Sequence, residues 1–150
     1  MKEETVQLTI DGNTVTVPSE STILDAAKEA GVEIPTLCHL DQTTSNGICR
    51  LCVVEIDGAP GMHPACVTKV SEGAVVRTRT PDIMRVRRTI LEMLASTVDL
   101  SESPDICAML DSCGARPDRF AGGETRQQRI IEDNPVYIRD YSKCILCWRC

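Results

Sequence analysis

Residues 45–52 read SNGICRLC, a short loop sequence that places Cys49 and Cys52 three positions apart. Cys38 precedes them and Cys66 follows, which gives the spacing C-x10-C-x2-C-x13-C. A small, flexible loop of this kind can fold over a metal–sulfide core and direct backbone N–H groups at its sulfurs. Four thiolates suit either a [2Fe–2S] cluster or a tetrahedral zinc ion, because both prefer soft anionic sulfur ligands.

The unequal spacing of these cysteines favours the cluster over zinc. Structural zinc sites usually combine two tight cysteine pairs, whereas only Cys49 and Cys52 form such a pair here. One loop with three ligands and a distant fourth is typical of ferredoxin-type [2Fe–2S] sites. A Rieske centre needs two histidine ligands, and His39 and His63 do not fit that pattern. We expect both histidines to be polar neighbours, and a non-redox zinc-binding interaction module is the alternative hypothesis.

The number of cysteines and the net charge limit the class of protein to which this chain can belong. Nine cysteines, with residues 1–4 leading into a strand rather than a signal-peptide core, predict reduced thiols in the cytoplasm. An odd number also fits poorly with a complete disulfide framework. The net charge of −6 argues against a nucleic-acid partner, and no apolar run reaches membrane-spanning length. We expect a cytoplasmic protein that does not insert into a membrane.

The first part of the chain has the pattern of a small α+β sheet domain. Alternation of apolar and polar residues predicts short strands at 5–10, 14–17 and 52–56. Residues 65–70 and 74–78 look like two further short strands. Residues 11–13, Asp-Gly-Asn, join the first two strands and are a strong hairpin signal. Ser21 or Thr22 can cap a helix that ends at Gly31. A hairpin, a crossing helix and further strands are therefore expected.

A second helix is predicted to begin at Thr80 and Pro81, which suit an N-cap and a first helical turn. Its expected apolar stripe consists of Ile83, Val86, Ile90, Met93 and Leu94. Its arginines are expected to form the solvated face, the alternative being contact with an acidic partner: Arg85, Arg87 and Arg88. Beyond the helix we expect an irregular connector with short helical turns at 99–123, a helix at 125–132 and an extended segment at 134–140.

Three segments carry a family resemblance: PTLC at 35–38, GICRLCVVE at 47–55 and PACVT at 64–68. Over residues 1–96 the chain resembles the [2Fe–2S] domain that opens the large iron–sulfur subunit of respiratory complex I (the 75 kDa type). The same domain begins the alpha subunit of NAD(P)-linked formate dehydrogenases and many [FeFe]-hydrogenases. The resemblance implies a ferredoxin-like β-grasp fold and one [2Fe–2S] cluster, with these ligands: Cys38, Cys49, Cys52 and Cys66.

The middle of the chain departs from the family pattern. These relatives carry one histidine and three cysteines spaced H-x3-C-x2-C-x5-C, which bind a [4Fe–4S] cluster. Cys107 and Cys113 keep the last interval, but Leu100 and Pro104 occupy the histidine and first cysteine positions. Two ligands do not normally hold a four-iron cluster, so we predict that Cys107 and Cys113 are non-ligands that pack beneath a loop. The alternative is that they join ligands from elsewhere.

Cys144, Cys147 and Cys150 follow the spacing C-x2-C-x2-C, three-quarters of a bacterial ferredoxin run. We expect them to supply three ligands of a [4Fe–4S] site whose fourth ligand comes from further sequence or another chain, and we favour a longer parent protein. Trp148 occupies a position where relatives often carry Gly. We expect a partly exposed ring packed on an adjoining domain, the alternative being a ring that shields the sulfur and shifts its potential.

We divide the chain into three parts: a [2Fe–2S] β-grasp domain at 1–79, a helix and connector at 80–133 that contains the degenerate histidine-and-cysteine cluster site, and an incomplete [4Fe–4S] ferredoxin-type module at 134–150. No catalytic constellation is recognisable. The resemblance implies an electron-transfer segment of a multi-subunit NAD(P)H-linked oxidoreductase. Its partners would be a flavin/NAD(P)H-oxidising subunit and other iron–sulfur subunits or domains. A formate dehydrogenase-like parent is expected first, then complex I-like, then [FeFe]-hydrogenase-like.

Overall fold

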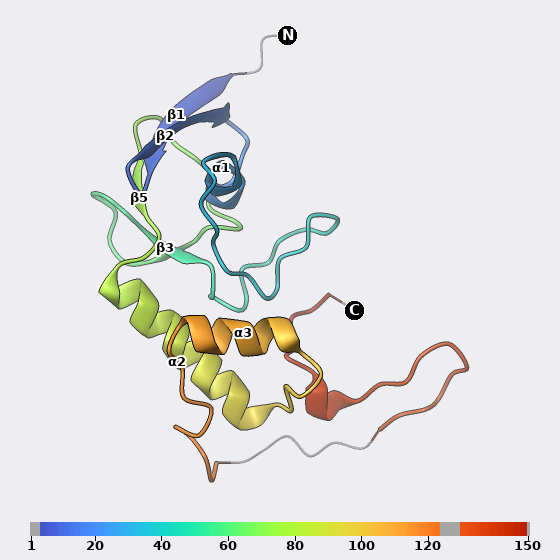
Figure 1. Cartoon of the computed structure of the whole chain (residues 1–150). Helices are drawn as coiled ribbons and strands as arrows, with labels where there is room; N and C mark the ends of the chain where they lie inside the picture. Colours follow the sequence, from blue (N-terminus) through green and yellow to red (C-terminus); the bar gives the residue numbers. More distant parts are fainter. Residues whose placement is uncertain (1–3, 124–129, 150) are drawn as a thin grey trace. The chain divides into compact units, whose positions relative to one another are not determined.

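The computed structural model describes residues 4–123 and 130–149 (Figure 1). These belong to two compact units, one formed by Met1–Arg87 with Arg149–Cys150 and the other by Arg88–Trp148. In the described ranges, no helix is long and apolar enough to cross a membrane. The domain boundaries expected at residues 79 and 133 stay a prediction.

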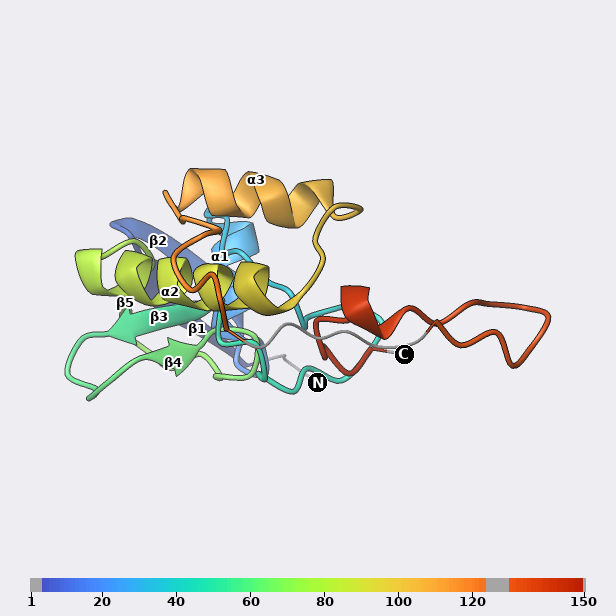
Figure 2. The same ribbon diagram turned by 90° about the horizontal axis from the view of Figure 1, so that it is seen from below.

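The first unit contains a five-stranded mixed sheet with the order β2-β1-β5-β3-β4. Its strands are β1 (Thr5–Ile10), β2 (Asn13–Pro18), β3 (Val53–Ile56), β4 (His63–Pro64) and β5 (Val75–Arg77). β1 pairs antiparallel with β2 and parallel with β5, while β3 pairs antiparallel with both β5 and β4. Figure 2 shows β3 beside β4 at one end of the sheet. The predicted α+β class and ferredoxin-like order of elements are confirmed.

The β1–β2 hairpin turns at Asp11 and Gly12, which have positive φ angles of 47° and 87°. Two consecutive left-handed residues suit a tight hairpin between twisted strands. The Asp11 carboxylate also accepts hydrogen bonds from the backbone N–H and the hydroxyl of buried Thr78. The turn therefore also fixes the chain just after β5.

Helix α1 (Ile23–Glu29) begins at Thr22, as expected. The Thr22 hydroxyl accepts from the Asp25 N–H and the Asp25 carboxylate accepts from the Thr22 N–H, a complete capping box. Its apolar face joins the core of the sheet through four residues: Ile23, Leu24, Ala26 and Ala27. Because two of these are alanines, the helix can pack close to the sheet.

The strand predicted at 65–70 is wrong in position. The strand is β4 (His63–Pro64), and the chain then turns, with the N–H groups of Val67 and Thr68 both donating to the Pro64 carbonyl. Residues 65–70 are rich in apolar and β-branched residues, which favours a strand locally, but the hydrogen bonds to Pro64 close a turn instead. The turn places Cys66 in the interior of the unit.

Helix α2 (Pro81–Thr97) starts as predicted, with the Thr80 hydroxyl accepting from the Ile83 N–H. The expected side-chain distribution is wrong in part: Arg87 is only 2% exposed, whereas Met93 is 57% exposed. The buried stripe follows the i, i+4, i+8 spacing of Ile83, Arg87 and Leu91. The expectation for Arg87 is wrong because it infers exposure from the charge of the side chain and not from its position in this stripe.

In the second unit, residues 104–112 form a regular helix, α3 (Pro104–Ser112), rather than isolated turns. Pro104 sits in its first turn, where a missing N–H costs nothing. Residues 124–129, which cover most of the helix expected at 125–132, lie outside the described residues. Ile131 pairs with Arg139 in an isolated bridge, and the loop between them turns at Asn134, so the segment at 134–140 is not simply extended. A short 3-10 helix, η1 (Tyr141–Lys143), follows.

A buried carboxylate fastens the segment after α3 to α2. Glu92 accepts from the Arg116 N–H at 3.1 Å and from the Arg119 guanidinium at 2.6 Å. Burial by itself would raise the pKa of Glu92, but the Arg116 N–H and the Arg119 guanidinium outweigh it, and the pKa lies below its ordinary value. Glu92 is therefore ionised in the folded protein at neutral pH.

We expect Glu92→Gln to lower the thermal unfolding midpoint at neutral pH, because the neutral amide leaves Arg119 without its charged partner. A depressed carboxyl pKa stabilises the fold above the ordinary value of 4.5, and this stabilisation is lost as pH falls through the folded-state pKa. The difference between the two proteins should therefore shrink on acidification, as followed by circular dichroism. Asp82→Asn, at an exposed ion pair with Arg85, is the control and should change little. A pH-independent difference would contradict this role of the ionised carboxylate.

Candidate metal centre

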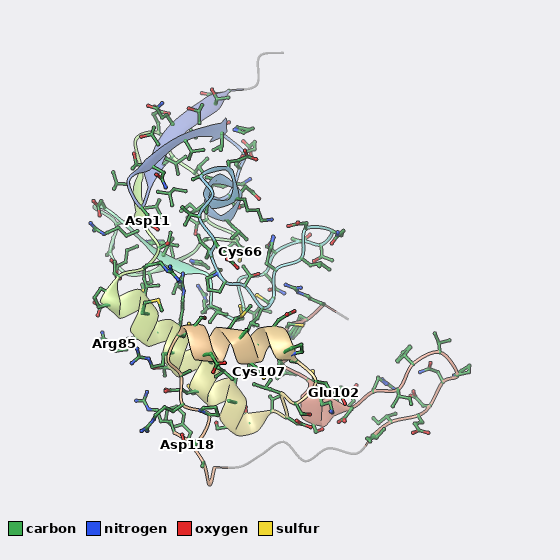
Figure 3. All side chains as sticks on the ribbon, viewed as in Figure 1. Asp11, Cys66, Arg85, Glu102, Cys107 and Asp118 are labelled. Atoms are coloured by element: carbon green, nitrogen blue, oxygen red, sulfur yellow. The ribbon has the colours of Figure 1, made fainter. Side chains whose placement is uncertain are left out.

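Loops of the first unit position the four cysteines of the predicted [2Fe–2S] site. Cys38 follows α1, and Cys49 and Cys52 lie in the loop that enters β3. Cys66, labelled in Figure 3, lies in the turn after β4. Cys38, Cys52 and Cys66 are at most 3% exposed, and Cys49 is half-buried. The site is thus built into the edge of the core rather than onto an exposed surface loop.

The structure brings these four sulfurs into one electrostatic environment. Burial, then repulsion from Cys52 and, more weakly, from Cys38 and Cys49, raises the pKa of the Cys66 thiol to about 12. Burial likewise raises the pKa of Cys38, whose sulfur accepts from the Cys49 N–H at 3.4 Å. Among the thiols, Cys49 therefore has the largest effect on the pKa of Cys38, and Cys52 has the largest effect on the pKa of Cys66.

This donor set fits a thiolate-bound metal core. Four thiolates packed together with little water repel one another, so they need positive charge among them. Within the described part of the chain, no three His, Cys, Asp or Glu side chains form a group suited to one metal ion. A [2Fe–2S] cluster does not require such a group, because two cysteines bind each iron and sulfides bridge the two irons. The two thiol pairs match that requirement.

Backbone geometry in the 45–52 loop turns N–H groups toward sulfur. Arg50 has a φ of 58°, a left-handed conformation that is uncommon for a residue with a side chain. Burial alone would raise the pKa of Cys49, but N–H groups, that of Leu51 first, outweigh burial and lower it. The strained residue next to Cys49 therefore belongs to a conformation that stabilises its thiolate.

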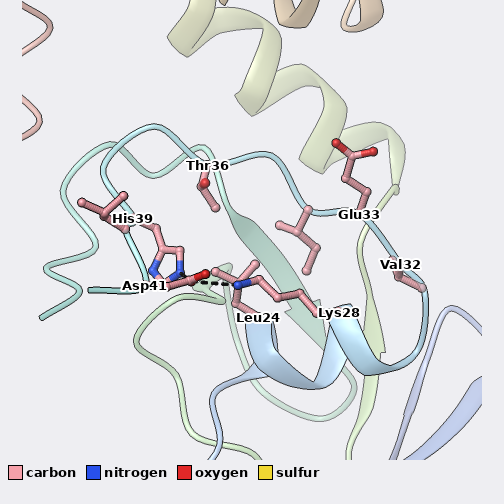
Figure 4. A pocket seen from close by; sticks show the side chains of 9 residues that line it. Leu24, Lys28, Val32, Glu33, Thr36, His39 and Asp41 are labelled. Carbon is pink, nitrogen blue, oxygen red and sulfur yellow. Dashed lines mark hydrogen bonds and ion pairs between the residues drawn. The ribbon is translucent and has the colours of Figure 1, made fainter. Parts of the chain in front are cut away.

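His39 lies beside this site without an unused ring nitrogen. Its Nδ1 lies 2.7 Å from the Ser45 hydroxyl and its Nε2 lies 2.9 Å from the Asp41 carboxylate, which also binds Lys28 (Figure 4). His39, Asp41 and Lys28 line a cavity of about 260 Å³ that Leu24 also lines. Lys28, followed by His39, lowers the pKa of Asp41. This network supports the expectation that His39 is a polar neighbour of the cysteine loop.

The middle cysteines lie in the second unit, on and after α3. Cys113 is buried on the same helical face as Ile106 and Leu110, at the spacing i, i+4, i+7. Cys107 is exposed, with its sulfur 3.7 Å from the Leu100 carbonyl. The expectation that both pack beneath a loop is wrong for Cys107, because α3 is regular and Cys107 falls beside its buried stripe. Cys113 is buried, in line with Ile106 and Leu110. That neither binds iron stays a prediction.

The terminal cysteines share the geometry of the first loop. Cys144 and Cys147 are half-buried, and the Leu146 N–H donates to the Cys144 sulfur at 3.4 Å. Leu146 and Trp148 have positive φ angles of 55° and 62°. Cys150 lies outside the described residues. The left-handed backbone at Trp148 is a conformation that favours glycine, and Trp148 is 80% exposed. The packing of its ring on an adjoining domain stays a prediction.

Sequence reasoning missed one residue that contacts the cysteine loop. Arg87 on α2 donates to the Leu51 carbonyl through Nε and to the Val53 carbonyl through Nη2, both at 3.0 Å. The available signal was its i, i+4 spacing from Ile83 and Leu91, which places it in the buried stripe.

Gly47→Ala should destabilise the first unit by about 1–2 kcal/mol or more, because Gly47 has a φ of 62° and a Cβ there would lie 3.3 Å from the Val67 side chain. Gly58→Ala is the matched control: its φ is 79°, but a Cβ there meets nothing within 4 Å. Chemical denaturation gives the loss of unfolding free energy in each variant. The amount by which the loss in Gly47→Ala exceeds that in Gly58→Ala measures the close approach of the loop to the Cys66 turn. Equal costs at the two glycines would refute that contact.

Trp148→Gly should stabilise the chain by up to about 1 kcal/mol, since the relief of left-handed strain exceeds the added flexibility of the unfolded chain. Trp148→Ala removes the same ring but keeps the Cβ that causes the strain, so it should give no such gain. Denaturant unfolding of the three proteins separates the effect of the backbone from that of the ring. A gain of the same size in both variants would show that the ring, and not the φ angle, is unfavourable.

Comparison with known proteins agrees with this geometry. A family described as "2Fe-2S iron-sulfur cluster binding domain" matches residues 3–81. The NADP-reducing hydrogenase subunit HndD of Solidesulfovibrio fructosivorans is 39% identical over 95% of this chain and 26% of its own length. The NADPH-Fe(3+) oxidoreductase subunit alpha of Geobacter sulfurreducens is 37% identical over 97% of this chain and 18% of its own length. The chain thus spans about a quarter or less of these relatives.

A solved structure shows the same fold. A chain of an NAD+-reducing [NiFe]-hydrogenase in the H2-reduced state superposes with a TM-score of 0.84 and 32% sequence identity. The match covers 95% of this chain and 62% of that one. Since the family match takes in more than half of the residues and contains all four cysteines of the first site, this chain belongs to the family of 2Fe-2S iron–sulfur cluster binding domains.

Proposed function

We propose that this chain is an electron-transfer segment in which Cys38, Cys49, Cys52 and Cys66 hold one [2Fe–2S] cluster. The observation that carries the proposal is the gathering of these four thiols, three of them at most 3% exposed, in mutual electrostatic contact. The cluster, when bound, supplies one-electron redox chemistry. The protein supplies thiolates, N–H donors to sulfur and cover from water.

The four thiols differ in burial, so one side of the proposed cluster site lies closer to the protein surface than the others. Cys38, Cys52 and Cys66 face the core, whereas Cys49 is half-buried and its neighbour Ile48 is 46% exposed. Electron exchange is fastest where a redox centre comes closest to the surface, so we place the approach of the electron partner on the Cys49 side. The apolar Ile48 side chain there suits a transient protein contact.

Two further groups of cysteines extend this proposal. Cys144, Cys147 and Cys150 would supply three ligands of a [4Fe–4S] cluster, with a fourth from further sequence or another chain. The N–H contact to the Cys144 sulfur and the left-handed residues of this segment support that assignment. Cys107 and Cys113 would not take part, since Leu100 and Pro104 stand where relatives supply ligands.

The parent assembly would be a multi-subunit NAD(P)H-linked oxidoreductase. A flavin/NAD(P)H-oxidising subunit and other iron–sulfur subunits would be the partners, and a reducing cytoplasm suits a chain with nine cysteines. The names of the similar proteins, among them hydrogenase and NADPH-Fe(3+) oxidoreductase subunits, support this class. They favour a hydrogenase- or NADPH-oxidoreductase-type parent over the formate dehydrogenase-like parent expected first. The zinc alternative gains no support, because the family match is to iron–sulfur domains.

Cys49→Ala should abolish the [2Fe–2S] signal of the anaerobically purified protein, because an iron loses one of its two protein ligands. The measurements are iron and acid-labile sulfide content, visible absorption and EPR of the reduced protein. Cys113→Ala is the control: it removes a thiol that is more deeply buried than that of Cys49, yet it should leave every cluster signal unchanged. Cys107→Ala repeats the control at an exposed position.

Three results would contradict the proposal. Zinc without iron or sulfide in the purified protein would support the interaction-module alternative. An unchanged [2Fe–2S] signal in Cys49→Ala would remove that residue from the ligand set. Loss of a cluster signal in Cys113→Ala, with the fold intact by circular dichroism, would show that the middle pair binds iron.

A further inference from the structure

Arg87 is a permanent positive charge buried next to the proposed cluster site. Its side chain is 2% exposed and lies between Ile83 and Leu91 in the buried stripe of α2. A guanidinium does not lose its proton in proteins, so this charge is present at every physiological pH. Burying such a charge is costly unless its donors are satisfied.

The guanidinium fixes the backbone on both sides of one predicted ligand. Nε donates to the Leu51 carbonyl and Nη2 donates to the Val53 carbonyl, each at 3.0 Å, so the two bonds bracket Cys52. The Cys52 carbonyl itself accepts from the Ala65 N–H at 3.1 Å. Three successive carbonyls around Cys52 are therefore held, and Ala65 directly precedes Cys66. This network ties together the backbone that carries the Cys52–Cys66 thiol pair.

The charge of Arg87 acts on the site in a way that a neutral hydrogen-bond donor does not. Neutral side chains can satisfy carbonyls, and buried charges contribute little net stability compared with well-packed apolar residues. One-electron reduction of a thiolate-bound cluster adds a negative charge to a site that is already anionic. A fixed cation one peptide group from Cys52, in a water-poor region, interacts more strongly with the reduced form than with the oxidised form. The outer hydrogen bonds and charges around an iron–sulfur centre tune its potential.

We propose that Arg87 is a positioning residue of the [2Fe–2S] site that holds Cys52 in its ligating conformation and favours the reduced cluster. This inference rests on the proposed function, since it requires Cys52 to bind iron. It states that Arg87 has two effects on the [2Fe–2S] cluster: it slows loss of the cluster and it raises the reduction potential.

The test compares Arg87→Met, Arg87→Lys and wild type as full chains purified anaerobically. EPR-monitored redox titration gives the midpoint potential, and challenge with an iron chelator gives the rate of cluster loss. At the wild-type midpoint potential, Arg87→Met should show an oxidised-to-reduced ratio raised about tenfold, which is about 59 mV for a one-electron couple. Arg87→Lys keeps the charge but cannot bridge both carbonyls with a planar fork, so its potential should stay near wild type while its cluster is lost faster.

Arg85→Met is the matched control, because Arg85 lies on the same helix but its side chain is 73% exposed and paired with Asp82. It should change neither the potential nor the rate of cluster loss. If Arg87→Met takes up no iron, Arg87→Gln provides a neutral side chain that can still donate hydrogen bonds and should show the same shift in potential. If neither neutral variant loads, the chelator experiment on Arg87→Lys decides: a rate equal to wild type overturns the positioning role.

An unchanged potential in a loaded neutral variant would overturn the electrostatic role of Arg87. Equal shifts in Arg87→Lys and Arg87→Met would do the same, since they would assign the effect to geometry rather than charge. Absence of a [2Fe–2S] spectrum in the wild-type protein would instead contradict the proposed function, and this result needs no Arg87 variant. The two failures are therefore distinguishable.

Discussion

One constraint shapes the loops of the first unit: four thiols are brought into one region, with Cys38, Cys52 and Cys66 buried and Cys49 half-buried. As free thiolates they would repel one another, and burial works against their ionisation. The surrounding elements reduce this cost. N–H groups face the Cys49 sulfur, the turn after β4 places Cys66 inward, and α2 holds the carbonyls around Cys52. The sheet and α1 supply the rigid support on which these loops stand.

The segments between closely spaced cysteines share one backbone conformation, a residue with a positive φ angle. Each interval of two residues between neighbouring cysteines contains one left-handed residue: Arg50, Leu146 and Trp148. Two extended residues would point successive side chains to opposite faces, whereas a left-handed residue turns the chain so that both sulfurs can face one point. None of the three is glycine, so each carries strain, and strained residues of this kind concentrate at functional sites. The device is common to the first site and to the incomplete terminal one.

Local signals in the sequence were enough to predict much of this fold. The Asp-Gly turn, the Thr22 cap and the Thr80-Pro81 start each depend on neighbouring residues, and all three lie where expected. The cysteine spacing likewise indicated the family, which the comparison confirms. Features set by distant contacts were not predictable in this way. The burial of Arg87 depends on carbonyls more than thirty positions away, and the inward position of Cys66 depends on its packing in the core.

The high pKa of Cys66 has a consequence for how the site comes to be filled. At neutral pH this sulfur carries a proton until iron arrives, because its pKa is about 12. Cluster insertion is then an exchange in which hydrogen ions leave as iron enters, so maturation releases acid and proceeds more readily in alkaline medium. The same coupling protects the empty protein: a protonated, buried sulfur is a poor nucleophile, so it resists oxidation while it waits for metal.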